Sequence, residues 1–321
     1  YARWSPVFDA PDRRTLDGLS RETGYIRDVL EKVYRLTALL ADVRRTPDVH
    51  GKLALKGGTA LQSIHVGFRR LSVDVDFNYV GGLERDVMER DRAGLRLALT
   101  RLFEQQGYDV DDERARHSEH SFVLAYRNSA GNRDRLKFEV NYSERLPATD
   151  LEVQVLDHPF DALGEVSVLS YGPEELFASK TRALVTRATP RDLFDVHLIA
   201  SGVVPNHQVL YRKLLIFYLC MAPGDAREVR TDLIGSVDER DVKRFLLPLL
   251  RKGGERPRLE EMKEVAIAHV EGLLDFTLDE RAFLDGFYDE GRFDQEVLFG
   301  DLPVAGNLAE HPVIRWRLQG R

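Results

Sequence analysis

The chain has 321 residues, of which 43% are hydrophobic and 31% charged, a composition typical of a globular protein with a well-buried core. Its formal net charge of -7 argues against a protein that coats nucleic acid nonspecifically, because that mode needs an excess of Lys and Arg against phosphate. With a single cysteine, Cys220, no apolar run near the roughly 18 residues of a membrane span and no signal-peptide core at its N-terminus, the chain is expected to be cytoplasmic.

The first 106 residues predict helices that alternate with short strands. Apolar residues from Ile26 to Leu40 recur with a 3.6-residue period, which predicts one helix over 20–45 with Ser20 as its N-cap. The patterns that follow predict a strand at 52–55, a turn into a helix at 57–67, a strand at 72–80 and a helix at 84–106.

The remainder of the chain changes from strands to helices. Apolar and polar residues alternate over 121–144, which predicts two strands hinged on a hairpin loop at 128–133. Short strands are expected at 151–156 and 166–169. From Pro173, a favoured first helical residue, helices are predicted at 174–186, 191–200, 208–221, 239–250, 259–274 and 279–288. We therefore expect an α+β fold, with a first domain of residues 1–170 and an α-helical second domain of residues 171–321.

Two carboxylates share one face of the strand predicted at 72–80. Side chains alternate along a strand, so Val75 and Phe77 are expected in the core, while Ser72, Asp74 and Asp76 face the other way. Like charges this close raise each other's pKa unless a cation lies between them. A hard divalent ion such as Mg²⁺ suits such a pair, because it is usually held by one or two carboxylates together with substrate phosphates.

A glycine turn precedes this strand and predicts a phosphate site. Gly57 and Gly58 have no side chains to cover the backbone where a helix begins at Thr59. Free N–H groups together with the positive end of a helix dipole bind phosphate. Each motif alone is weak, since glycine pairs are common structural turns and D-x-D is more often an exposed polar strand face. Together they supply donors for the phosphates of a nucleoside triphosphate and carboxylates for a metal ion.

A third carboxylate is expected beside the first two. In the strand LKFEVNY, Leu136, Phe138 and Val140 take one face, and Lys137 and Glu139 the other. Pairing of this strand with the D-x-D strand would place Glu139 next to the aspartates, and three acidic groups suit a pair of metal ions. The alternative is that Glu139 simply pairs with Lys137 or an arginine on an exposed sheet face.

Three separated stretches carry a family resemblance. KGGTAL, RRLSVDVDF and SYGPEELFASKTRALVTRATPRDLFDVHLIA resemble the AbiEii-type nucleotidyltransferases, toxins of type IV toxin-antitoxin systems that include the mycobacterial MenT toxins. The resemblance covers residues 53–200. It implies a polymerase-beta-like nucleotidyltransferase domain with a mixed sheet, followed by an α-helical domain.

The resemblance also assigns roles to residues. The triphosphate would be bound by Gly57, Gly58, Thr59 and Lys180, and the catalytic residues would be Asp74, Asp76, Lys180 and Asp195, with Mg²⁺ or Mn²⁺ on Asp74 and Asp76. From their places on the strand faces, Ser72 is a further candidate for nucleotide binding and Glu139 a further candidate metal ligand. The helical domain would thus contribute Lys180 and Asp195 to the site. The structural alternatives are a solvated Lys180 and a helix-surface ion pair between Arg191 and Asp195. Threonine in place of serine, and a longer spacing from Thr59 to Asp74, depart from the family pattern.

By resemblance the expected reaction is transfer of a nucleotide, a pyrimidine by preference, to the 3′ acceptor end of tRNA, which blocks aminoacylation and growth. Candidate contacts to tRNA phosphates are Arg69, Arg70, Arg182 and Arg187. A cognate winged-helix antitoxin of the AbiEi kind is expected as a partner. The alternatives are nucleotidyl transfer to a small molecule or a protein hydroxyl, and a protein that only binds nucleotide or a partner.

Overall fold

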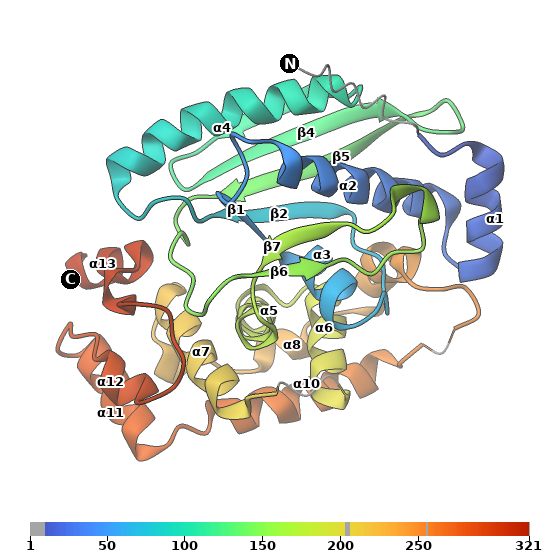
Figure 1. Ribbon diagram of the computed structural model, residues 1–321. Helices are drawn as coiled ribbons and strands as arrows, with labels where there is room; N and C mark the ends of the chain where they lie inside the picture. The colour runs from blue at the N-terminus through green and yellow to red at the C-terminus, as the bar shows by residue number, and fades with distance from the viewer. Residues whose placement is uncertain (1–9, 203–205, 255, 321) are drawn as a thin grey trace. The chain divides into compact units, whose positions relative to one another are not determined.

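The structure is a computed structural model that describes residues 10–202, 206–254 and 256–320 (Figure 1). The chain forms two compact units, of which the first takes the described residues of Tyr1–Arg145, Glu152–Ser170 and Leu249–Gly254. The second takes those of Leu146–Leu151, Tyr171–Pro248 and Glu255–Arg321. The chain therefore changes unit after residue 170, and the short segments Leu146–Leu151 and Leu249–Gly254 change unit as well.

The first unit is built on a mixed sheet. Its described strands are β1 (Leu53–Lys56), β2 (Asp74–Tyr79), β3 (Asp109–Ala115), β4 (Glu119–Arg127), β5 (Arg133–Asn141), β6 (Glu152–Val155) and β7 (Ser167–Ser170). They lie in the order β3-β4-β5-β2-β1-β7-β6. β2 runs parallel to β5 and β1 parallel to β7, whereas the other neighbours are antiparallel. The predicted hairpin is confirmed as β4 and β5.

Two long helices cover one face of this sheet (Figure 1). In α4 (Arg85–Gln105), Phe103 packs its ring against Phe122 of β4 and Phe138 of β5, with ring centroids 5.3 and 5.2 Å apart. In α2 (Arg27–Arg45), the Arg35 guanidinium lies 4.1 Å from the ring centroid of Tyr126. Since these aromatic residues alternate with polar ones, burial of one face fixes which side chains point to the other.

The single helix expected over 20–45 is instead two helices. α1 (Arg13–Thr23) ends at Gly24, whose φ of 78° is left-handed and whose N–H donates to the Ser20 carbonyl. Glycine adopts this conformation without the steric cost that a side chain would bring, so it stops the helix. The Ser20 hydroxyl donates to the Tyr25 carbonyl and is not an N-cap. α2 then begins after Ile26, with no side-chain cap.

Strand β3 was not predicted, because its sequence DVDDERA lacks apolar alternation. It lies at the edge of the sheet and pairs only with β4. Its charged side chains are held by ion pairs, with Glu113 bound by Arg96 at 2.5 Å and Asp111 bound by Arg135 at 2.7 Å. Charged residues are typical of edge strands, where they discourage pairing with another chain.

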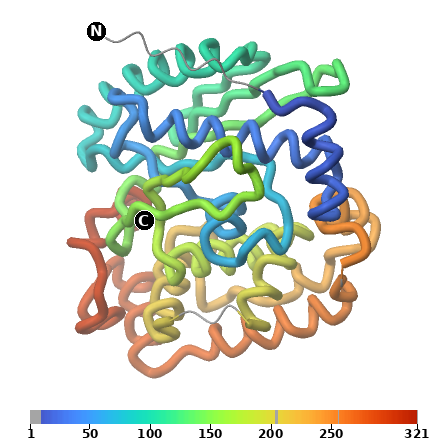
Figure 2. The backbone as a smooth tube through the Cα atoms, turned by 45° about the vertical axis from the view of Figure 1, so that its right-hand side comes forward, coloured from blue at the N-terminus to red at the C-terminus, as the bar shows by residue number. Residues whose placement is uncertain are grey.

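The second unit is helical, as expected, and Figure 2 shows its helices in colours from yellow-green to red. Its helices are α5 (Pro173–Arg187), α6 (Pro190–Ser201), α7 (Gln208–Met221), α8 (Asp232–Gly235), α9 (Glu239–Asp241), α10 (Leu259–Leu274), α11 (Leu278–Tyr288), α12 (Gln295–Phe299) and α13 (Pro312–Gln319). The helix expected over 239–250 is broken into α9, a π-helical turn at Val242–Leu246 and a 3-10 turn at Leu247–Leu249. Pro248 lacks a backbone N–H and cannot continue a regular helix. No helix among the described residues is long and apolar enough to cross a membrane.

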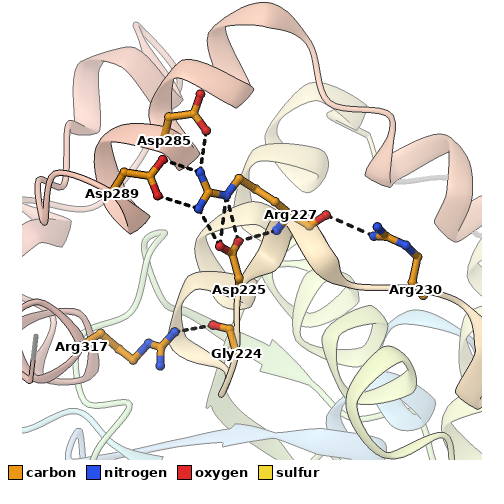
Figure 3. A network of polar contacts seen from close by, with 7 residues as sticks. All are labelled: Gly224, Asp225, Arg227, Arg230, Asp285, Asp289 and Arg317. Atoms are coloured by element: carbon orange, nitrogen blue, oxygen red, sulfur yellow. Dashed lines mark hydrogen bonds and ion pairs between the residues drawn. The ribbon is translucent and has the colours of Figure 1, made fainter.

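An arginine ties α11 to the turn that follows α7 (Figure 3). The Arg227 guanidinium donates to Asp225, to Asp285 of α11 and to Asp289, the residue that follows α11, with the contacts to Asp285 and Asp289 between 2.7 and 2.8 Å. The ring of Tyr288 lies 5.3 Å from the same guanidinium. Three carboxylates raise the pKa of Arg227, so it stays charged and acts as a structural crosslink.

We expect the stability of the helical unit to fall in acid through Glu280, which lies 1% exposed in the first turn of α11. Burial by itself would raise its pKa, but donors from Arg212, the Thr277 backbone and Lys213 lower it to about 2. The contribution of Glu280 to the free energy of unfolding is therefore fully present above its ordinary pKa near 4.5, and it is lost as the pH falls toward 2. Glu280→Gln should remove about 1–2 kcal/mol of this acid dependence.

Urea unfolding between pH 2 and 7, followed by circular dichroism, measures this effect. The exposed Glu264 of α10 provides the control, since Glu264→Gln should leave the acid dependence unchanged. An acid limb in Glu280→Gln as steep as in the wild type would contradict the assignment.

Candidate active site

The register of three central strands brings the predicted acidic residues together. β2 and β5 pair in parallel so that Asp76 lies opposite Glu139 and Asp74 opposite Lys137. On the other side of β2, Lys56 of β1 lies opposite Asp76. The expected pairing of the LKFEVNY strand beside the D-x-D strand is confirmed, and Asp74, Asp76 and Glu139 form what we call the carboxylate face. It is the sheet face opposite to the one that α2 and α4 cover.

Gly57 lies directly against the carboxylate of Asp76. It opens the short helix α3 (Gly57–Ala60), which continues into a π-helical turn at Leu61–His65. Its φ is +73°, and a Cβ built on it would come within 2.5 Å of Asp76 Oδ2. Two independent reasons therefore require glycine here, the left-handed backbone and the close approach of the carboxylate. The backbone at the start of α3 thus packs closely against the D-x-D strand.

The rest of the glycine turn is equally tight. A Cβ on Gly58 would meet Ser72 Oγ at 2.9 Å and Arg70 Nη2 at 2.8 Å. The Thr59 hydroxyl donates to the Asp74 carbonyl at 2.6 Å, which fixes the helix against β2. Thr59 and Ser72 are both buried. Their role as nucleotide ligands stays a prediction, but the structure places Gly57, Gly58, Thr59 and Ser72 around one end of β2.

Lys137 occupies the carboxylate face together with the acidic residues. Its Nζ lies 2.6 Å from Glu139 Oε2. Burial tends to lower the pKa of Lys137, but Glu139, Asp74 and Asp76 outweigh it and raise the pKa above its ordinary value. Burial raises the pKa of Glu139, which Lys137 opposes and the neighbouring Glu119 increases. Glu139 therefore has a cation partner already within the sheet.

The donor set fits one hard divalent ion. Asp74 and Asp76 present two oxygen ligands on one strand face, as expected where substrate phosphates and water complete the coordination of Mg²⁺. Among the described residues, no three Asp, Glu, His or Cys side chains are grouped as a metal site. Metal binding by Glu139 stays a prediction.

In the helical unit, Lys180 of α5 meets two aspartates of α6. Its Nζ lies 2.9 Å from Asp195 Oδ2 and 3.6 Å from Asp192 Oδ1. Lys180 is 6% exposed and both carboxylates are buried. The structure therefore brings together two of the residues that the sequence singled out, and Lys180 is not a solvated surface lysine.

Asp192 is the residue near this lysine that the sequence did not assign to the site. The Arg187 guanidinium holds it with two hydrogen bonds of 2.7 and 3.0 Å, and the Thr189 hydroxyl donates to it at 2.7 Å. Although burial opposes the effect, Arg187 and Lys180 hold the pKa of Asp192 well below its usual range. The spacing of Asp192 and Asp195, three residues apart on a helix, is the signal that places them on one face.

Two of the four arginines proposed to contact tRNA have structural roles. Arg70 is 1% exposed, with a guanidinium that donates to the Leu71 carbonyl and a backbone N–H that donates to Gln62, so it cannot reach a phosphate on the surface. Arg187 binds Asp192, although its side chain is 62% exposed. The sequence could not separate these cases, because burial of a single arginine leaves no periodic pattern.

Comparisons with known proteins show the family and the fold of the chain. A family model described as nucleotidyl transferase AbiEii toxin, type IV TA system, matches residues 38–266. Among solved structures, the chain is similar to MenT4, a nucleotidyltransferase toxin from Mycobacterium tuberculosis H37Rv, with a TM-score of 0.66 at 19% identity. That match covers 87% of this chain and 96% of MenT4. No curated protein matches the chain.

Proposed function

Because the chain belongs to the AbiEii family of nucleotidyl transferase toxins of type IV toxin-antitoxin systems, we propose that it transfers a nucleotide from a triphosphate to the 3′ end of tRNA. The fold is the α+β fold of MenT4, as the resemblance implied. The observation that carries the proposal is the approach of Gly57 to Asp76, because it joins a backbone turn suited to phosphates to the D-x-D carboxylates.

In the first unit, different residues bind the phosphates and the metal ion of the donor nucleoside triphosphate. The N–H groups at the start of α3 bind phosphate oxygens, and Gly57 and Gly58 allow those oxygens to approach the backbone. Asp74 and Asp76 hold Mg²⁺ or Mn²⁺, with Glu139 as a third candidate ligand. When bound, the ion supplies positive charge that stabilises the reacting phosphate and the leaving pyrophosphate. The Thr59 hydroxyl fixes the turn against β2, and Thr59 and Ser72 are the further proposed nucleotide ligands.

Lys180 and Asp195 complete the proposed set of catalytic residues. An ammonium is a compact point charge, suited to a triphosphate oxygen. Asp195 holds this ammonium at 2.9 Å in a buried environment, which limits the positions that the lysine can take. We assign Lys180 to the triphosphate and Asp195 to positioning it. The terminal ribose hydroxyl of the acceptor attacks the α-phosphorus, its proton leaves to solvent or base, and pyrophosphate departs.

The acceptor and the donor base are the finer parts of the proposal. A pyrimidine nucleotide and the tRNA acceptor end follow from the resemblance, and the modification would block aminoacylation and so growth in the cytoplasm. Arg69, which is exposed, and Arg182 remain candidates for phosphate contacts. A toxin of this family implies a cognate antitoxin, which we propose to be a winged-helix protein of the AbiEi kind.

A second acceptor class is favoured by charge. The net charge of -7 repels a polyanion, so a small molecule or a protein hydroxyl is the alternative acceptor for the same chemistry. The two hypotheses share the same transferase chemistry and differ only in the acceptor.

The test is to incubate the protein with total tRNA, Mg²⁺ and each α-labelled nucleoside triphosphate in turn, with Asp76→Ala as the control. We expect label on tRNA with one pyrimidine triphosphate, and none with the variant. Metal-dependent consumption of nucleotide without labelled tRNA would favour the small-molecule or protein acceptor. Nucleotide binding without metal-dependent turnover would contradict a transferase.

A further inference from the structure

A short segment from the second half of the chain brings two cations to the first unit. This segment, Leu249–Gly254, has the sequence LLRKGG and belongs to the first unit, and we call it the return segment. The Leu249 carbonyl accepts a hydrogen bond from the Leu71 N–H at 2.8 Å, and the Lys252 N–H donates to the Gly24 carbonyl at 2.7 Å. The backbone of the return segment is therefore fixed at two points to residues that lie far away in the sequence.

The return segment lies beside the loop that carries Arg69. The Arg251 guanidinium is 5.3 Å from the ring centroid of Tyr25, and the Tyr25 hydroxyl donates to the Phe68 carbonyl. Phe68 has a φ of 51°, a left-handed conformation that is rare for a bulky residue. It is 8% exposed, and its N–H donates to the Gln62 carbonyl at 2.8 Å. The buried Phe68 thus fixes the place where the chain leaves the core at the exposed Arg69.

The two neighbouring segments have a surplus of positive charge, although the whole chain is acidic. GFRRL at 67–71 and LLRKGG at 249–254 contain four Lys and Arg residues and no Asp or Glu. Three of these cations are exposed, namely Arg69, Arg251 and Lys252. Asp157 approaches the loop at Gly67, where its Oδ2 lies 3.9 Å from the position of an added Cβ. Arg69 and Lys252 form no ion pair with a described residue, so the surplus is available to an anion from solution.

The three exposed cations lie near the strand that carries the catalytic carboxylates. Leu71, which is bound to the return segment, precedes Asp74 by three residues, so their Cα atoms are at most about 11 Å apart. Arg69 precedes Asp74 by five residues, which limits that separation to about 18 Å. A nucleic-acid strand whose terminal hydroxyl reacts at Asp74 therefore has phosphates within reach of this surface.

We propose that Arg69, Arg251 and Lys252 bind backbone phosphates of the acceptor RNA, close to its reacting 3′ end. The inference rests on the proposed function, in which the acceptor strand ends at Asp74 and Asp76. Guanidinium and ammonium groups on phosphates fix the position of a strand without reading its bases. This surface therefore contributes affinity and register, and the choice among RNA sequences is made elsewhere.

The test is the binding of 5′-labelled total tRNA to the full chain, without nucleotide, by fluorescence anisotropy from about 50 to 200 mM KCl. The double variant Arg69→Gln/Lys252→Gln should lower the slope of log Kd against log salt by about 1.4, because each phosphate contact on a single strand contributes about 0.7. At about 0.1 M salt, binding should weaken about fivefold or more. Both side chains are exposed, so circular dichroism should show an intact fold.

Kinetics and matched variants separate this surface from a general effect of charge. In Arg69→Gln/Lys252→Gln, the KM for tRNA should rise by a factor similar to that of the Kd, with kcat and the KM for the triphosphate unchanged. Arg69→Lys/Lys252→Arg retains both charges and should behave as the wild type. The control Arg90→Gln/Arg116→Gln also removes two exposed arginines, one in α4 and one directly after β3, which lies three strands from β2. It should leave the salt slope and the KM for tRNA unchanged.

Equal salt slopes and equal KM values for tRNA in Arg69→Gln/Lys252→Gln and in the control would overturn the inference. If label were still transferred to tRNA in that case, the proposed function would stand and only the role of these cations would fall. A wild-type protein that neither binds nor labels tRNA, yet consumes nucleotide with a metal ion, would remove the tRNA acceptor and this inference with it.

Discussion

Gly57→Ala should lower nucleotidyl transfer by about 10²–10³-fold while the protein remains folded. The new methyl group would lie 2.5 Å from Asp76 Oδ2, so the carboxylate must move from its place beside the turn. A displacement of about 1 Å at a catalytic group is sufficient for a loss of this size. Initial rates of label transfer, with circular dichroism as the check on folding, measure it.

The strain of a left-handed alanine must be separated from the displacement of Asp76. Gly107→Ala provides the control, because Gly107 has a φ of +75° and nothing within 4 Å of the added Cβ. It should carry the same backbone cost of about 1–3 kcal/mol and retain full transfer activity. A Gly57→Ala protein with activity near that of Gly107→Ala would mean that Asp76 is not held by the turn.

Glu175→Ala should destabilise the helical unit by about 3–5 kcal/mol. This glutamate of α5 is 1% exposed and accepts four hydrogen bonds. The Ala148 backbone, the Thr149 backbone and the Tyr218 hydroxyl each donate at 2.8 Å, and the Thr149 hydroxyl donates at 2.6 Å. Removal of the carboxylate leaves these buried donors without an acceptor, which costs far more than the bonds contribute net.

Calorimetry should show the loss as a fall in melting temperature of roughly 10 °C. The neighbouring Glu174→Ala is the matched control, since Glu174 accepts one hydrogen bond, from the His207 backbone at 3.0 Å, and should cost under about 1 kcal/mol. Glu175→Gln retains the shape and one acceptor oxygen, and should fall between the two. Equal melting temperatures for Glu174→Ala and Glu175→Ala would refute the role of the buried carboxylate.

The Glu175 contacts also explain how the segment Leu146–Leu151 is held. This segment leaves β5 and returns to β6, yet it belongs to the helical unit. Its backbone donors at Ala148 and Thr149 find their acceptor in α5 and not in a strand. No short sequence pattern predicts this contact, because the local sequence around a helical glutamate does not reveal whether its side chain is buried or exposed.

The sequence by itself determined most of the local structure and which of the candidate residues share a strand face. Alternation in SVDVDF and LKFEVNY placed Asp74, Asp76 and Glu139 on strand faces opposite Val75, Phe77 and Phe138, as the structure confirms. Helical periodicity found α4, α5, α6, α7, α10 and α11 within a few residues. These features depend on neighbours two to four positions apart, so the order of residues is enough to predict them.

The tertiary structure decided everything that depends on residues distant in the chain. Strand pairing put Glu139 beside Asp76 and left Lys137 bound to Glu139, and the contact with Asp76 explains why position 57 must be glycine. Burial turned Arg70 from a proposed surface contact into a structural residue. Charged β3 became a strand because β4 offered it a partner. Such outcomes are set by packing and long-range hydrogen bonding, which no short window of sequence contains.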